Sequence, residues 1–233
     1  MRRLEERVAI VTGGARGQGA SHAERLAREG AAVVSVDVLD DAGEATAARL
    51  RDDGLDVTYR HLDVTDPDGW RAIVDGCARL DVLVNNAGII HVAPLAEERL
   101  EDWNRLLAVN ATGTLLGMQA AIPAMRTAGG GSIVNVASIF GVTGSEGYVA
   151  YTASKAAIAA LTLAVAEEVA PDGIWVNAVV PSIMDTEANR RAMPKADHGT
   201  WPKLDEVAAT VAFLASPQNA VTRAALVPVY GRS

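Results

Sequence analysis

The sequence predicts a single α/β domain: a doubly wound, mainly parallel sheet of seven strands with helices on both faces. Two observations predict this architecture. Short apolar runs alternate along the chain with longer helix-like stretches, and this alternation is typical of strand–helix–strand units, which form parallel sheets. No repeat, low-complexity tract or linker divides the 233 residues, so we expect one domain over residues 1–233.

Seven apolar runs are expected to form the strands. The first, at residues 8–11, is continuously apolar and ends in glycines, which fits a strand buried on both faces. The third, at residues 57–62, is the weakest of the seven. The others are expected at residues 32–37, 82–84, 132–136, 174–180 and 224–229.

Helix-like stretches fill the intervals between these runs. Gly54 follows the end of the second stretch, and Asp66 provides an N-cap for the third, with Pro67 at its first helical position. Pro171 and Gly173 end the sixth stretch. The helices are expected at residues 20–28, 40–52, 66–78, 97–107, 112–125, 151–169 and 204–215, and a short substrate loop at about residues 184–203.

Composition and charge exclude several classes of function. A net charge of −8 argues against a protein that binds nucleic-acid phosphates, and an aromatic share of 4% argues against a base-stacking surface. The single cysteine, Cys77, excludes an internal disulfide and a cysteine-based zinc site. The first residues contain no apolar signal segment, so we expect a soluble, cytoplasmic protein.

Residues 106–125 carry no charge over a length that could span a membrane. Polar residues, a proline and two glycines within this window predict instead a deeply buried segment or a subunit interface, and no membrane partner.

A glycine-rich turn follows the first strand. Gly13, Gly17 and Gly19 lie between that strand and the first helix, and glycines permit a tight turn and close approach of the backbone to a ligand. The helix that follows presents free N–H groups and the positive end of its dipole to a pyrophosphate. The turn therefore predicts a dinucleotide site, although its spacing is not the usual GxGxxG.

Asp37, at the end of the second strand, indicates which dinucleotide binds. An acid at this point accepts hydrogen bonds from ribose hydroxyls and repels a 2′-phosphate, which favours NAD over NADP. Arg16 in the turn would favour the 2′-phosphate instead. We give Asp37 more weight because its repulsion acts at short range, so NAD is the predicted cofactor.

Three polar residues near the carboxyl ends of the strands predict acid–base chemistry. Tyr151 and Lys155 are four residues apart and so share one face of a helix, and Ser138 follows the fifth strand. A nearby ammonium lowers the pKa of a tyrosine, which makes Tyr151 a usable acid–base for an alcohol or carbonyl oxygen. Ser138 is expected to hold the same substrate oxygen.

Together these residues resemble the short-chain dehydrogenase/reductase family over nearly the whole chain. The matching residues are Thr12, Gly13, Gly17, Gly19, Asp63, Val64, Asn85, Asn86, Ala87, Gly88, Asn110, Ser138, Tyr151 and Lys155. The segment 13–23 is similar to the bacterial hydroxysteroid and terpenoid-alcohol branch. The resemblance implies a Rossmann-type fold and reversible hydride transfer between NAD(H) and a secondary alcohol or ketone, steroid- or terpenoid-like in this branch.

The resemblance also implies a role for each matching residue. Asp63 and the N–H of Val64 hold the adenine ring, and Asn110 orders a water beside Lys155 that completes a proton relay. The implied catalytic set is Asn110, Ser138, Tyr151 and Lys155. The implied cofactor contacts are Gly13, Arg16, Gly17, Gln18, Gly19, Asp37, Asp63, Val64, Asn85, Ala87, Gly88, Tyr151, Lys155, Pro181, Ile183 and Thr186.

The resemblance further implies a homo-oligomer, a dimer or tetramer, with the charge-poor helices in the interface. The chain departs from the family pattern at Ser182, where a glycine is usual, and in residues 186–201, which are shorter than the usual lid.

Other functions remain as alternatives. A non-catalytic, NAD-sensing binding protein could use the same scaffold, and a methyltransferase would leave Tyr151 and Lys155 unexplained. A sugar-nucleotide epimerase normally needs a longer chain. The four histidines, His22, His61, His91 and His198, show no metal-binding spacing, so no metal is expected.

Overall fold

The seven strands form one parallel sheet in the order β3-β2-β1-β4-β5-β6-β7. The computed structural model describes residues 2–232, the side chain of residue 188 excepted. The strands are β1 (Val8–Thr12), β2 (Ala32–Asp37), β3 (Val57–His61), β4 (Val82–Asn85), β5 (Gly131–Val136), β6 (Ile174–Pro181) and β7 (Leu226–Val229). The predicted doubly wound α/β fold is confirmed.

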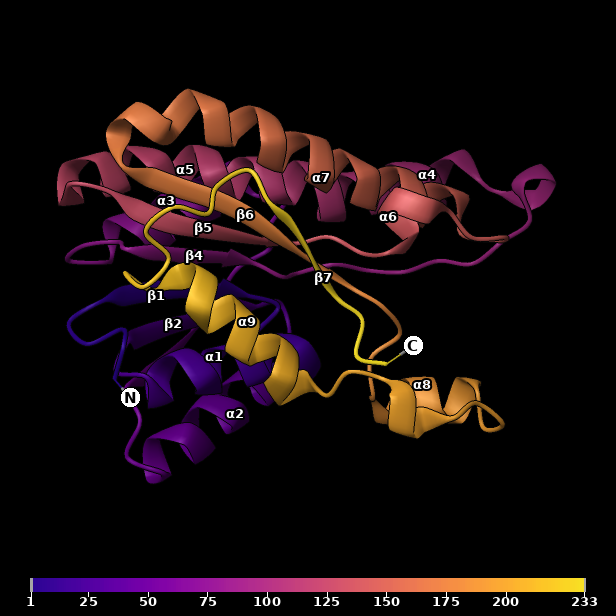
Figure 1. Cartoon of the computed structure of the whole chain (residues 1–233), viewed down its shortest axis with the longest axis horizontal. Helices are drawn as coiled ribbons and strands as arrows, with labels where there is room; N and C mark the ends of the chain where they lie inside the picture. The colour runs from indigo at the N-terminus through magenta and orange to yellow at the C-terminus, as the bar shows by residue number, and fades with distance from the viewer. Residues whose placement is uncertain (1, 233) are drawn as a thin grey trace.

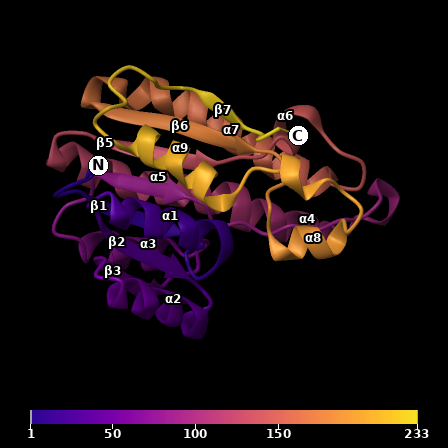
Figure 2. The ribbon, with the colours of Figure 1, turned by 60° about the horizontal axis from the view of Figure 1, so that its bottom comes forward.

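Helices cover both faces of the sheet (Figure 1). One face carries α1 (Gly17–Arg28), α2 (Asp40–Asp52) and α9 (Leu204–Ala215). The other carries α3 (Pro67–Asp75), α4 (Leu100–Leu106), α5 (Gly113–Ala128) and α7 (Val149–Val169). Two short helices, α6 (Phe140–Thr143) and α8 (Glu187–Ala192), follow β5 and β6, and α8 stands apart from the sheet in both views (Figures 1 and 2).

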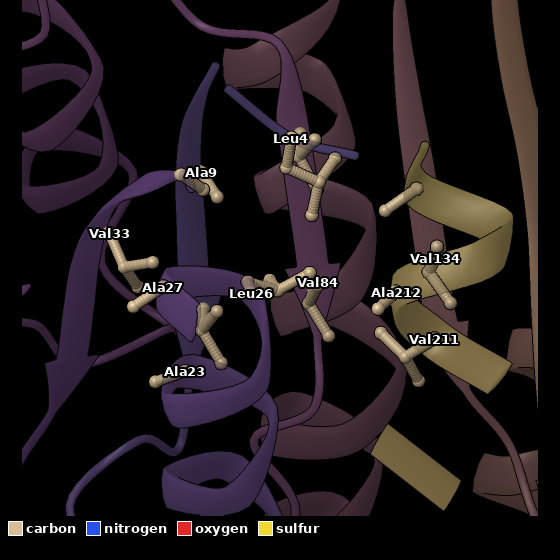
Figure 3. Packing of buried hydrophobic residues seen from close by; sticks show 14 of the residues in the cluster. Leu4, Ala9, Ala23, Leu26, Ala27, Val33, Val84, Val134, Val211 and Ala212 are labelled. Carbon is tan, nitrogen blue, oxygen red and sulfur yellow. The ribbon is translucent and has the colours of Figure 1, made fainter. Parts of the chain in front are cut away.

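The core has two layers because alternate residues of a strand point to opposite faces. In β1, Ala9 and Val11 pack in the layer under α1 and α9, whereas Ile10 packs with α3 and α5 on the other side. The first layer is drawn in Figure 3, which labels Leu4, Ala9, Ala23, Leu26, Ala27, Val33, Val84, Val134, Val211 and Ala212. This burial on both faces explains the continuously apolar strands.

The helices expected at residues 97–107 and 112–125 form one continuous rod from Leu100 to Ala128. The turn between α4 and α5, Leu107–Thr112, is π-helical. Gly113 lies within this continuous helix. Its missing side chain permits close packing against another segment, because a Cβ there would lie 2.7 Å from Cγ2 of Val64. Expecting two separate helices was therefore wrong.

Other bounds differ by a few residues. The first helix begins at Gly17, inside the glycine-rich turn, and the third ends at Asp75. Part of the expected substrate loop is helical: α8 begins after Thr186, whose side chain accepts a hydrogen bond from the N–H of Asn189 at 3.2 Å.

Two helical stretches, Leu100–Ala128 and Val149–Asp172, could cross a membrane by length and composition alone. Both pack on one face of the sheet, and 39% of each apolar window is buried within the chain. The charge-poor segment is thus partly core and partly outer surface, which is less burial than its composition predicted.

Candidate active site

The site forms at the carboxyl edge of the sheet, between β1 and β4. The chain runs outward from β1 to β3 and then crosses back to β4, and open α/β sheets bind ligands at such a reversal. Thr12 ends β1, and its hydroxyl oxygen accepts hydrogen bonds from the N–H groups of Asn86 and Ala87, both at 2.9 Å. The glycine-rich turn is thereby joined to the segment after β4.

Three glycines give the turn its shape. Gly13 has a φ of +66°, and a Cβ there would lie 2.8 Å from Nδ2 of Asn86. A Cβ on Gly19 would lie 2.1 Å from the carbonyl oxygen of Gly13. Gly17 has a φ of +59°, and apart from its chain neighbours and the backbone of its own helix no described atom lies within 4 Å of the position its Cβ would take. Gly13 and Gly19 close the turn, and Gly17 leaves backbone open at the start of α1, the geometry that a pyrophosphate needs.

A cleft of about 720 Å³ extends from this turn to the ends of β2 and β3. The Asp37 carboxylate on its wall is fixed by three backbone N–H groups, those of Ala15 (3.1 Å), Val38 (2.8 Å) and Leu39 (3.2 Å). Ten of the expected cofactor contacts line this cleft: Gly13, Arg16, Gly17, Gln18, Gly19, Asp37, Asp63, Val64, Ala87 and Gly88.

A second cavity of about 250 Å³ holds Ser138, Tyr151 and Lys155. The two cavities adjoin, because Gln18, Asn86, Gly88 and Ile89 line both. At this junction the Nε2 atom of Gln18 is buried and has no hydrogen-bond partner among the described residues. A buried donor without a partner is uncommon in a folded protein, so this atom is suited to an acceptor on a bound ligand.

Burial dominates the electrostatics of Tyr151 and Lys155. It raises the pKa of Tyr151, and the hydrogen bond with Ser138 opposes that rise. It also lowers the pKa of Lys155 to about 8. The Lys155 ammonium donates to the carbonyl oxygen of Val136 at 2.8 Å. The expected lowering of the Tyr151 pKa by Lys155 is therefore not observed: the pKa is raised by burial, and the opposing contribution comes from Ser138.

Asn110 is fully buried in the π-helical turn, and its side chain ties three segments together. Oδ1 accepts from the N–H of Ile89 at 2.8 Å, and Nδ2 donates to the Ile89 carbonyl and to Oγ of Ser154, both at 2.9 Å. Ser154 in turn donates to the carbonyl oxygen of Tyr151 at 2.8 Å. Asn110 and Ser154 thus connect the segment after β4 to the helical turn that carries Tyr151.

Three expected cofactor contacts lie away from both cavities. Asn85 points into the core, where Nδ2 donates to Oδ1 of Asn135 at 2.9 Å, and its neighbour Asn86 lines both cavities instead. The alternation of side chains along β4 could have signalled this exchange. Pro181 lines the smaller cavity, whereas Ile183 and Thr186 line neither cavity. The Thr186 side chain caps α8 instead. As cofactor contacts, Asn85, Ile183 and Thr186 remain predictions.

Sequence reasoning also missed Ser154 and the aromatic residues around Tyr151. The position of Ser154, three residues after Tyr151, was a usable signal, because such residues share a helix face. The rings of Phe140 and Tyr148 lie 6.5 Å and 6.3 Å from the Tyr151 ring, centroid to centroid. Phe140 lies four residues after the end of β5, and nothing in the sequence around it indicated a place near Tyr151.

Within residues 2–232 no group of three or more His, Cys, Asp or Glu side chains could hold a metal ion. His22 is a buried residue of α1, and burial lowers its pKa to about 3, so its ring is neutral.

Comparison with known proteins places these features in a family. A family model described as short chain dehydrogenase matches residues 7–197. A 3-alpha-(or 20-beta)-hydroxysteroid dehydrogenase of Mycobacterium bovis is 46% identical over 188 residues, which cover 79% of this chain and 71% of the relative. A trans-4-hydroxycyclohexanecarboxylate dehydrogenase of Sinomonas cyclohexanicum is 38% identical, covering 98% and 93%. A crystal structure of a gluconate 5-dehydrogenase from Burkholderia cenocepacia, in complex with NADP and tartrate, is 31% identical and superposes with a TM-score of 0.91, covering 98% and 95%.

Proposed function

The chain belongs to the short-chain dehydrogenase/reductase family and is an oxidoreductase that acts on CH–OH groups, and we propose that it interconverts a secondary alcohol and a ketone with NAD(H), using Tyr151 as the acid–base. One observation carries the proposal. Ser138, Tyr151 and Lys155 converge in a small cavity that opens into the larger cleft. Three side chains suited to acid–base chemistry thus adjoin a cleft of about 720 Å³.

The residues of the larger cleft fit a nicotinamide dinucleotide. The open backbone at Gly17 and the unpartnered Nε2 of Gln18 are suited to the negatively charged and carbonyl oxygens of such a group. When bound, the nicotinamide supplies the hydride acceptor or donor for the reaction. The Asp37 carboxylate favours a free ribose hydroxyl over a 2′-phosphate, so NAD is the proposed cofactor, although one solved relative binds NADP.

The acid–base role follows from the surroundings of Tyr151. Because its pKa is raised, the phenol is protonated near neutral pH and can donate its proton to a carbonyl oxygen. Ser138 would hold that oxygen beside the Tyr151 hydroxyl, and Lys155 would stabilise the phenolate that forms. Asn110 completes the proposed catalytic set by fixing the helical turn of Tyr151 through Ser154.

The mouth of the small cavity supports an apolar substrate. Ile90 lines the cavity and is 60% exposed, and Met184 lies on the cavity wall. Exposed apolar side chains beside a reaction site favour an apolar ligand. We therefore propose a secondary alcohol on an alicyclic frame, steroid- or terpenoid-like, which agrees with the names of the relatives.

Substitution of Tyr151 by Phe tests the reaction. Oxidation of NADH by steroid, terpenoid and simple cyclic ketones, followed by absorbance, should fall by about 10²- to 10⁴-fold, with NADH binding retained. Tyr148→Phe is the matched control, because its ring keeps the contacts with Phe140 and Tyr151. Unchanged turnover in Tyr151→Phe would sink the proposal. A wild type that binds NADH but reduces no ketone would favour the non-catalytic alternative.

The cofactor preference has a separate test. Asp37→Ala should raise the affinity for NADPH relative to NADH, since it removes the charge that repels a 2′-phosphate. A wild type that already prefers NADPH would refute the choice of NAD.

A further inference from the structure

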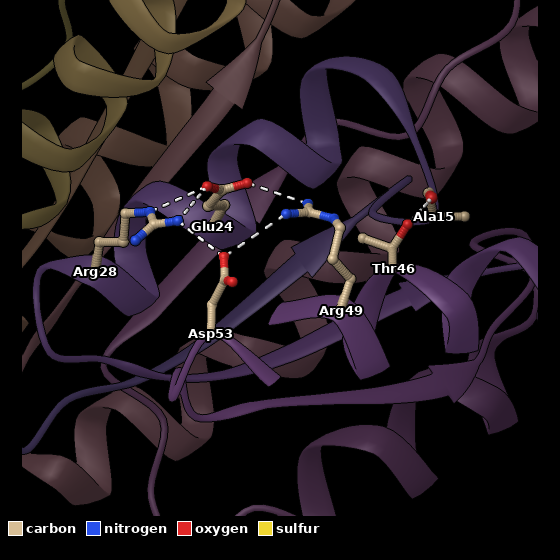
Figure 4. A network of polar contacts seen from close by, with 6 residues as sticks. All are labelled: Ala15, Glu24, Arg28, Thr46, Arg49 and Asp53. Carbon is tan, nitrogen blue, oxygen red and sulfur yellow. Dashed lines mark hydrogen bonds and ion pairs between the residues drawn. The ribbon is translucent and has the colours of Figure 1, made fainter. Parts of the chain in front are cut away.

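Both backbone polar groups of Ala15, in the turn that precedes α1, form hydrogen bonds with side chains. Its N–H donates to Oδ2 of Asp37 at 3.1 Å, and its carbonyl oxygen accepts from the Thr46 hydroxyl at 2.7 Å. Figure 4 shows Thr46 reaching from α2 toward this carbonyl. One residue of the turn is thus tied both to the end of β2 and to the middle of α2.

The Thr46 hydrogen bond fixes more than one group. In a trans peptide the C=O and the next N–H point in opposite directions, and the described chain has no cis peptide bonds. Holding the Ala15 carbonyl therefore also sets the direction of the Arg16 N–H. Arg16 is the N-cap of α1, and Gly17 is the first residue of the helix. This peptide plane therefore orients the backbone N–H at the start of α1, where the glycine-rich turn would bind a phosphate.

Ion pairs join α2, the helix that carries Thr46, to α1. Arg49, on the same helix, contacts Glu24 of α1 at 3.1 Å, and Arg28 of α1 contacts Asp53 at the end of α2 at 3.1 Å. These contacts appear together in Figure 4. These ion pairs link α2, which carries Thr46, to α1, which begins directly after Ala15 and Arg16.

From these contacts we propose that Thr46 is a positioning residue for the adenosine end of the cofactor. Thr46 holds Ala15, Ala15 orients the Asp37 carboxylate, and the pair sets both the affinity for NAD and the preference over NADP. The inference rests on the proposed function, because it requires that NAD occupy the larger cleft.

The test compares Thr46→Val, which removes the hydroxyl at nearly constant volume, with Thr46→Ser, which keeps it. Kd values for NADH and NADPH are measured by fluorescence titration. In Thr46→Val the Kd for NADH should rise by about fivefold, the effect of one lost hydrogen bond, and the NADPH/NADH Kd ratio should fall. Thr46→Ser should remain near wild type. A KM increase for NAD without a matching loss of kcat at saturation is also expected.

Arg51→Ala is the control for a purely structural role. It removes an ion pair with Glu44 within α2 but leaves the Thr46 hydroxyl and the ion pairs between α1 and α2, so it should lower Tm without changing the Kd ratio. The inference is overturned if Thr46→Val keeps the wild-type Kd ratio, whatever its Tm. A wild type that binds neither dinucleotide would instead sink the proposed function, so the two failures can be distinguished.

Discussion

The Nζ atom of Lys155 lies 5.8 Å from the centroid of the Tyr151 ring, one helical turn away on α7. Both groups are enclosed by protein, and burial shifts their pKa values in opposite directions, upward for Tyr151 and downward for Lys155. Each shift disfavours the charged form of its group. The chemistry of the site is therefore set by desolvation as much as by the pairing of the two side chains.

The buried ammonium predicts a pH dependence of stability. The pKa of Lys155 falls from 10.5 to about 8 on folding, so between these values the unfolded chain binds more protons, and stability rises with pH. The free energy of unfolding of wild type minus that of Lys155→Met should grow by about 3 kcal/mol between pH 7.5 and 11. Urea titrations across this range measure the difference, and a flat difference contradicts the prediction.

The raised pKa of Tyr151 predicts opposite pH profiles for the two reaction directions. Reduction of a ketone needs the phenol, which persists into alkaline solution, whereas oxidation of an alcohol needs the phenolate. The kcat/KM for oxidation should rise through the alkaline range while that for reduction stays level and then falls. Steady-state rates in both directions, from pH 6 to 11, test this. An oxidation rate that is already constant at neutral pH would show that the phenolate forms more easily.

The link through Ser154 predicts a loss of both stability and rate in Ser154→Ala. The change leaves the Asn110 amide with one protein partner fewer and frees the Tyr151 carbonyl, at a cost of about 1–3 kcal/mol in stability. We expect kcat to fall while the Kd for NADH is unchanged. Thr127→Val is the control, because it removes a hydroxyl that also donates to a helix carbonyl, on the exposed surface. If both variants behave alike, Ser154 has no positioning role.

The C-terminal residues hold the base of the segment that carries α8. The Ser182 hydroxyl donates to the Tyr230 carbonyl at 3.0 Å, and the N–H of Arg232 donates to the Thr200 carbonyl at 2.8 Å. Ser182→Gly should loosen this segment, raise KM for the alcohol and speed proteolysis within residues 186–200. Ser182→Thr, which keeps the hydroxyl, is the control. Equal proteolysis rates in wild type and Ser182→Gly would contradict this role for the serine.

The outer side of α7 bears on the proposed homo-oligomer. Leu163 is 43% exposed on this helix, beside a segment that carries few charges. An oligomer formed through this side should give a dimer or tetramer mass by light scattering, and Leu163→Glu should lower that mass. Ala45→Glu adds the same charge to the exposed surface of α2 on the opposite face and should not. A monomeric wild type would end the proposal.

Patterns within short segments predicted much of the fold. Apolar runs predicted the seven strands within a few residues, and the inner strands were the clearest, because a strand buried on both faces is apolar throughout. The start of α1 was misplaced because the glycine-rich turn continues directly into the helix. The helix from Leu100 to Ala128 was divided at residues 108–111, which the structure places in the π-helical turn Leu107–Thr112 that joins α4 to α5.

The sequence by itself determined the parallel α/β architecture, the glycine-rich turn and the convergence of Ser138, Tyr151 and Lys155 at one edge of the sheet. These features depend on local periodicity and on the common direction of parallel strands. Only the tertiary structure decided that Asn86 rather than Asn85 faces the cleft, that Ser154 joins Asn110 to Tyr151, and that burial raises the Tyr151 pKa. Those outcomes depend on which atoms of distant segments meet and on how much water they exclude.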